Sequence, residues 1–243
     1  MPTCVECGAA VSSLYTEYSK GNIRLTYCEH CKKLADKYVE HDFVIIFVDM
    51  ILHKKPVYRH LLFNRLPYRD LGVDPNVFKL GVLLILFDVY IKWFRLEQER
   101  TEIEVVGFSQ HALVFQYLYI LFLCIIEFLA FHFGVRLIVS LWYGGRYAIL
   151  KYNYITTTLI ISSFGKMLLI LMVIWDYTEL EHSWYLVNFI VFTSNVEALS
   201  VFLETGYLQT TLVIIFGILC RVLMQIAFAS ITGDSALVTM ASM

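Results

Sequence analysis

Two short cysteine pairs, Cys4-Val5-Glu6-Cys7 and Cys28-Glu29-His30-Cys31, decide how the start of this chain folds. Each pair has the Cys-x-x-Cys spacing, which lets one tight turn direct two thiolates toward a single metal ion. Two such turns complete a tetrahedral shell of four sulfurs. We therefore predict that Cys4, Cys7, Cys28 and Cys31 bind a structural Zn²⁺ and form a small zinc-ribbon-like β module over residues 1–40. A closed shell leaves no position for a substrate, so the site is expected to stabilise the fold and not to catalyse.

Between the pairs, residues 14–27 alternate apolar and polar side chains on both sides of Lys20-Gly21-Asn22. This pattern predicts a β-hairpin that brings the second pair back to the first. In an oxidising compartment the four cysteines would instead form two disulfides. The spacing and the basic flanks favour metal-bound thiolates in the reducing cytosol. Cys124 and Cys220 lie in apolar runs and are expected to be packing residues.

The rest of the chain has the composition of a membrane protein. Of its 243 residues 58% are hydrophobic and only 16% are charged, against about 25% charged in soluble domains. The fold class that we predict is an α-helical multi-span membrane protein carrying the small N-terminal module. Residues 77–243 would form the transmembrane domain, with five spans at about 77–94, 113–133, 154–175, 184–203 and 207–230. Only Thr205-Gly206 separate the last two, so they form a tight hairpin unless they do not both cross.

Residues 41–76 are expected to form a basic amphipathic segment at the membrane interface. Residues 43–52 are apolar but too short to cross, and five basic residues follow between positions 54 and 69. The alternative is a soluble helix that packs on the cysteine module, and both arrangements can hold together. The candidate contacts with a lipid headgroup or a partner protein are Tyr58, Arg59, His60 and Asn64, with ordinary interfacial anchoring as the alternative. Asp36, Lys37 and Tyr38 are expected to seat the module on the membrane part.

Ionisable residues inside the predicted spans include Asp88, Glu127, Lys166, Glu197 and Arg221. Each costs about 2.5–3.5 kcal/mol on insertion scales, so each needs a partner, water or the interface. We expect Lys166 to pair with Glu127, because both lie toward the middle of neighbouring spans. The two side chains are also candidates for binding a polar group of a lipid, with helix–helix association as the alternative.

The distribution of basic residues predicts the orientation. Eleven of the nineteen Lys and Arg precede residue 80, which favours a cytosolic N-terminus by the positive-inside rule. Five spans would then place the C-terminus on the opposite side. This orientation keeps the cysteine thiolates in reducing cytosol.

The sequence holds no catalytic motif that we could identify, which favours a protein that is not an enzyme. It has no P-loop, no Gly-rich dinucleotide fingerprint, no His-Glu-x-x-His and no Asp-x-x-Asp pair. We expect no nucleic-acid partner. An enzyme acting on lipid remains an alternative.

Specific motifs in the first quarter of the chain are the two cysteine pairs, Leu14–Thr26, Ala35–Asp42 and Lys55–Asn64, and weaker ones follow at Ser163–Lys166 and Thr193–Ala198. In these motifs the chain resembles the Arv family over its whole length, most specifically in the first quarter. The resemblance implies a multi-pass protein of the endoplasmic-reticulum membrane that maintains lipid homeostasis, linked to intracellular sterol transport, sphingolipid regulation and early glycosylphosphatidylinositol (GPI) anchor synthesis. The implied partners are membrane lipids such as a sterol, a sphingolipid or a GPI precursor. The alternative is an accessory subunit that docks and stimulates a GPI glycosyltransferase complex in that membrane.

Overall fold

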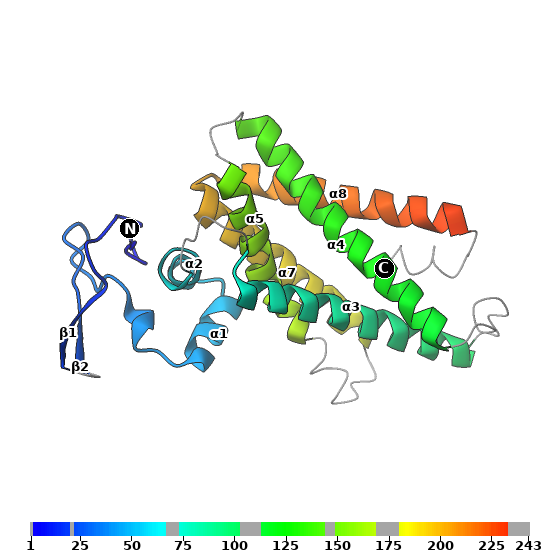
Figure 1. Cartoon of the computed structure of the whole chain (residues 1–243), viewed down its shortest axis with the longest axis horizontal. Coiled ribbons are helices and arrows are strands. Elements are labelled where there is room, and N and C mark those ends of the chain that lie inside the picture. Colours follow the sequence, from blue (N-terminus) through cyan, green and yellow to red (C-terminus); the bar gives the residue numbers. More distant parts are fainter. Residues whose placement is uncertain are drawn as a thin grey trace.

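The computed structural model describes residues 2–19, 22–66, 73–102, 113–143, 149–168 and 180–232. The cysteine module, with its strand pair, lies at one end of the molecule (Figure 1). Two short helices connect it to a bundle of long helices that extends toward the other end (Figure 1).

The predicted hairpin is confirmed. Strands β1 (Tyr15–Ser19) and β2 (Asn22–Leu25) pair antiparallel, with Tyr15 opposite Leu25. The register shifts between Glu17 and Ser19, as in a β-bulge, which adds twist to a two-stranded ribbon. The predicted turn residues Lys20 and Gly21 lie outside the described part of the chain.

Short helical elements follow the module. They are the 3-10 turn η1 (Lys37–Val39), helix α1 (Phe43–Ile51), helix α2 (Lys55–Arg59) and a π-helical turn η2 (His60–Arg65) that continues α2. Helix α1 has nine residues and is about 14 Å long, so it is too short to cross a bilayer, as the sequence predicted.

The long helices are α3 (Pro75–Glu102), α4 (Leu113–Tyr143), α5 (Ile149–Ser162), α7 (Leu180–Leu203) and α8 (Tyr207–Thr232), with the 3-10 turn η4 (Ser163–Lys166) directly after α5. Helix α3 starts as its sequence directs: Pro75 takes the first position, and the Asp74 carboxylate accepts from the backbone N–H of Asn76 at 2.8 Å.

Among the described residues, three helices are long and apolar enough to cross a membrane: Leu113–Trp142, Tyr185–Leu203 and Tyr207–Ile231. They coincide with the second, fourth and fifth predicted spans and support a membrane protein. The first predicted span lies in α3, which carries Lys79, Asp88 and Lys92. The third begins in α5, but that helix gives way to η4 at Ser163, and residues 169–179 lie outside the described part. Crossing by these two segments stays a prediction.

The connection between α7 and α8 is as tight as the sequence predicted. It consists of residues 204–206, and Glu204 takes a left-handed conformation with φ of 53°. Helix α8 begins at Tyr207, and the backbone N–H of Thr210 donates to the carbonyl of Gly206 at 3.2 Å.

Helices α4 and α8 pack closely where two glycines face the opposite helix. A Cβ on Gly217 would lie 2.5 Å from Cγ2 of Val135, and one on Gly134 would lie 2.8 Å from Sγ of Cys220. Small residues let membrane helices approach in this way, and the close contact replaces the hydrophobic driving force that is missing in lipid.

We predict that Gly217→Ala destabilises the protein, because the new methyl group clashes with Val135 and forces the two helices apart. Overpacking of this kind costs about 1–3 kcal/mol, and a lower thermal unfolding midpoint in detergent would report it. Gly206→Ala is the matched control, because nothing lies within 4 Å of its added Cβ. Equal midpoints for the two variants would contradict the packing described here.

Candidate functional site

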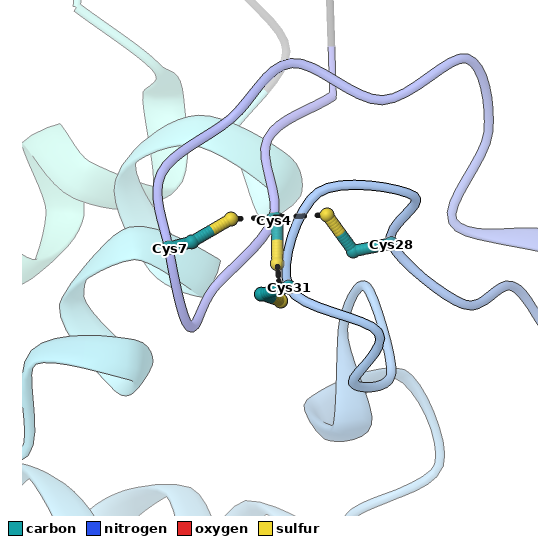
Figure 2. Close-up of side chains that lie close together, drawn as sticks. All are labelled: Cys4, Cys7, Cys28 and Cys31. Atoms are coloured by element: carbon teal, nitrogen blue, oxygen red, sulfur yellow. Dashed lines mark hydrogen bonds between the residues drawn. The ribbon is translucent and has the colours of Figure 1, made fainter.

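The four N-terminal cysteines meet at one point. Their Sγ atoms all lie within 4.8 Å of one another, with Cys4 and Cys31 at 3.7 Å and Cys7 and Cys28 at 3.7 Å. Figure 2 shows the four side chains converging from two loops. A tetrahedron with zinc–sulfur bonds of about 2.3 Å has sulfur–sulfur edges of about 3.8 Å. The donor set therefore fits Zn²⁺, and the four thiols are free and not joined as disulfides.

The two cysteine turns share one backbone pattern. The N–H of Cys4 donates to the carbonyl of Ala9, and the N–H of Cys28 donates to that of Lys33, both at 2.8 Å. Four residues after the first cysteine of each pair the backbone is left-handed, with φ of 82° at Gly8 and 60° at Lys32. The Cys-x-x-Cys spacing thus folds the same turn twice, and the hairpin places the two turns face to face.

The thiols differ in acidity because their surroundings differ. Burial raises the pKa of Cys4 to about 12. The backbone N–H of Cys31 lowers the pKa of Cys28 to about 7, against a smaller opposing effect of burial. A metal ion that binds here would displace the protons that remain on the sulfurs.

A buried carboxylate joins the cysteine module to the helices. Asp36 is fully buried and accepts from the backbone N–H of Tyr38 at 2.9 Å, from Nδ1–H of His60 at 2.7 Å and from Nδ2–H of Asn64 at 2.7 Å. The carboxylate can only accept, so Nδ1 of His60 is the donor. Close by, the Tyr38 hydroxyl donates to Asp49 at 2.8 Å. These contacts seat the module on the helical part, as predicted for Asp36 and Tyr38.

Asn64 and Arg59 extend this junction to the first cysteine turn. The Asn64 amide exchanges two hydrogen bonds with the backbone of Thr3, at 2.8 and 2.9 Å. The Arg59 guanidinium donates to the carbonyls of Val5 and Glu6 at 2.9 and 2.6 Å.

Tyr58 points the other way, into the bundle. Its side chain is fully buried, and its hydroxyl lies 2.8 Å from Oγ of Ser194 on α7. The structure thus engages Tyr58, Arg59, His60 and Asn64 in contacts within the chain. Binding of lipid or of a partner by these four side chains stays a prediction.

A second site lies among the long helices. A cavity of about 350 Å³ is bounded by residues of α3, α4, η4, α7 and α8. Its wall is mixed: apolar side chains such as Phe131 and Ile214 alternate with the polar groups Asp88, Glu127, His132, Ser163, Lys166, Asn188, Asn195, Arg221 and Gln225. The structure therefore brings the predicted residues Glu127 and Lys166 to one cavity.

The expected pair between Lys166 and Glu127 is nevertheless wrong. Lys166 donates to Asp88 on α3 at 2.6 Å. Glu127 is bound by Lys92 of α3 and by Arg221 of α8, with Nη2 of Arg221 at 3.0 Å from the carboxylate. The reason is packing: α4 lies mainly against α8 and α3, whereas η4 lies against α7 and α3. The consecutive helices α4 and α5 are therefore only minor neighbours in this bundle.

Sequence reasoning did not single out His132, Ser163 or Gln225. His132 is 7% exposed, and its Nδ1 lies 2.8 Å from the carbonyl of Phe128 in the preceding turn. The pattern that could have indicated it is a polar residue inside a long apolar run. The sequence does not separate His132 from the other polar residues of the predicted spans, and its place on the cavity wall distinguishes it.

We predict that Cys4→Ser releases the metal, because three thiolates bind zinc less well than four and the first turn loses its buried ligand. Zinc per protein, measured on purified protein, should fall sharply. Residues 2–19 should lose protection from hydrogen exchange while the long helices still insert. Cys220→Ser is the control and should keep its zinc. Full zinc content in the Cys4 variant would contradict the ligand assignment.

We predict that Asp36→Ala loosens the module from the helices. The change leaves Nδ1–H of the buried His60 and one N–H of the partly buried Asn64 amide without an acceptor, at a cost of about 1–3 kcal/mol. Limited proteolysis should then cleave between the module and α1 faster than in the unchanged protein. Asp42→Ala is the control, because Asp42 is exposed and its side chain makes no capping bond. Equal cleavage of the two variants would show that Asp36 does not hold the junction.

Comparison with known proteins addresses the family resemblance. Residues 3–199 match the model of the Arv1-like family. The chain is 42% identical over 230 residues to a protein named arv1 homolog from Dictyostelium discoideum, covering 91% of this chain and 93% of that protein. It is 38% identical to protein arv1 of Schizosaccharomyces pombe, with coverage of 96% and 87%, and 30% identical to protein ARV1 of Homo sapiens, with coverage of 95% and 83%.

No solved structure matches the chain. The match over most of the sequence confirms the resemblance that the cysteine pairs and the following motifs indicated. This chain therefore belongs to the Arv1-like family.

Proposed function

We propose that this membrane protein maintains lipid homeostasis without being an enzyme, by binding a lipid in the cavity among its long helices. Membership of the Arv1-like family supports a role in lipid homeostasis in general. The finer roles that we propose follow the family resemblance: intracellular sterol transport, sphingolipid regulation and early GPI-anchor synthesis at the endoplasmic reticulum. The absence of a recognisable catalytic motif in the sequence supports a protein that is not an enzyme.

The observation that carries the proposal is the polar cavity. Glu127 stands at the middle of the candidate span Leu113–Trp142, where bare charges are most costly. The wall of the cavity combines hydrogen-bonding groups with apolar side chains. This combination suits a molecule with a polar head and an apolar body.

We further propose that the cysteine module holds structural Zn²⁺ on the cytosolic side. The cluster geometry supports zinc, and the excess of basic residues before position 80 supports this orientation. The apolar side chains that helix α1 exposes support a position of this helix at the membrane surface, since Phe43 and Val44 are 73% and 67% exposed. Such a short helix with an apolar face can lie in the interface while Lys54 and Lys55 meet lipid phosphates.

The alternative is an accessory subunit that docks a GPI glycosyltransferase complex in the same membrane. The observation that favours it is that two tyrosines of the cysteine module are exposed, Tyr18 by 67% and Tyr27 by 62%. Exposed tyrosines are enriched where proteins meet partners.

The two functions can be separated by purifying the protein in mild detergent and analysing the lipids and the proteins of the same sample. If the protein handles lipid, defined lipids should copurify with it. The double variant Asp88→Asn with Lys166→Gln removes one ion pair from the cavity and should retain several-fold less lipid. Lys33→Gln on the module is the matched control. The accessory role predicts instead a stoichiometric enzyme partner that is lost with Tyr18→Ala and Tyr27→Ala. Copurification of neither lipid nor partner would contradict both.

A further inference from the structure

Four charged side chains line the cavity, two of each sign: Asp88, Glu127, Lys166 and Arg221. Asp88 pairs with Lys166, while Glu127 is shared by Arg221 and by Lys92, which does not itself line the cavity. With Lys92 the ion-paired cluster holds three cations and two carboxylates, an excess of one positive charge. Further charged residues on the same helices, among them Lys79 on α3, Arg136 on α4 and Glu197 on α7, do not line the cavity.

An uncompensated charge among membrane helices is costly unless a ligand of opposite sign accompanies it. The cations at the cavity retain the donors that such a ligand needs. Arg221 uses Nε and Nη2 on Glu127, and Lys166 spends one bond on Asp88. Within the described part of the chain, Nη1 of Arg221 has no acceptor. A guanidinium with a free N–H beside a lysine is well suited to phosphate oxygens.

His132 adds a second and independent feature. Its Nδ1 lies 2.8 Å from the carbonyl of Phe128, which can only accept, so Nδ1 carries the proton. In the neutral ring Nε2 is then an acceptor. Nε2 is buried, and no partner for it exists among the described residues. A buried acceptor on the wall of a cavity needs a donor from a ligand, and a hydroxyl group supplies one.

From these two features we propose that the cavity binds the headgroup of a phosphodiester lipid that carries one negative charge and at least one hydroxyl. The phosphate meets Arg221 and Lys166, and the hydroxyl donates to Nε2 of His132. Phosphatidylglycerol and phosphatidylinositol have this chemistry. Phosphatidylcholine lacks it because its choline restores the excess positive charge, and a sterol lacks it because it has a hydroxyl without a charge.

This inference rests on the proposed lipid-binding function and narrows it to one class of lipid. It is tested with the full-length, zinc-loaded protein in detergent, titrated with single lipids and followed by native mass spectrometry. The probes are phosphatidylglycerol, phosphatidylmethanol, phosphatidylcholine and cholesterol. Phosphatidylmethanol is the decisive one, because it has the same charge as phosphatidylglycerol and no hydroxyl.

We expect phosphatidylglycerol to bind about tenfold more tightly than phosphatidylcholine, and about three- to tenfold more tightly than phosphatidylmethanol. Arg221→Gln should remove the preference over phosphatidylcholine, whereas Arg221→Lys should retain most of it. His132→Leu should remove only the difference between phosphatidylglycerol and phosphatidylmethanol. Circular dichroism and zinc content would establish that each variant is folded.

The possible outcomes distinguish this inference from the lipid-binding function on which it rests. Saturable binding of cholesterol with no preference for the anionic lipids would overturn the inference and leave the lipid-binding function standing. An anionic preference that survives in Arg221→Gln, or a preference for phosphatidylglycerol over phosphatidylmethanol that survives in His132→Leu, would place the lipid elsewhere and also overturn it. If no lipid binds saturably, both fail.

Discussion

A carboxylate in the middle of a membrane helix must be held by cations from other helices, and Glu127 imposes this condition on the bundle. Lys92 on α3 and Arg221 on α8 both bind it, so one side chain of α4 fixes the faces that two other helices present. The Asp88–Lys166 pair ties η4 to α3 in the same way. Apolar packing alone would tolerate rotation or sliding of these helices, whereas ion pairs in a medium of low dielectric constant do not.

The cysteine module is part of the same body and not a separate unit. Asp36, His60 and Asn64 connect it to η2, and Tyr58 connects the neighbouring turn of α2 to Ser194 on α7. Ser194 in turn donates to the carbonyl of Ser162 at 2.8 Å, beside residues that line the cavity. Hydrogen bonds from one continuous segment, α2 with η2, thus reach both the cysteine module and α7. The fold of the module therefore bears on how α2 and α7 are placed.

The sequence predicted the features that depend on short-range geometry. Cys-x-x-Cys spacing and an intervening alternation determine the cysteine cluster and hairpin locally, so both are confirmed as a cluster and a strand pair. The sequence does not predict which helices pack against each other, because apolar runs carry no information about which helix lies beside which. That is why Lys166 was assigned to Glu127 in place of Asp88. The sequence predicts the junction role of Asp36 and Tyr38. For Arg59, His60 and Asn64 it predicts lipid or partner binding and does not reveal their contacts within the chain, since a basic and aromatic cluster looks alike whether it faces lipid or the chain's own backbone.

The short turn at residues 204–206 bears on how the protein enters the membrane. A connection of three residues contains no soluble loop, and none of these residues is basic. In the predicted orientation, with a cytosolic N-terminus and five spans, this turn lies on the cytosolic side, so none of its residues has to cross the bilayer. During biosynthesis α7 and α8 can therefore partition together, as a preformed pair of antiparallel helices, with their backbone groups already satisfied. The last two spans would then become embedded in a single step.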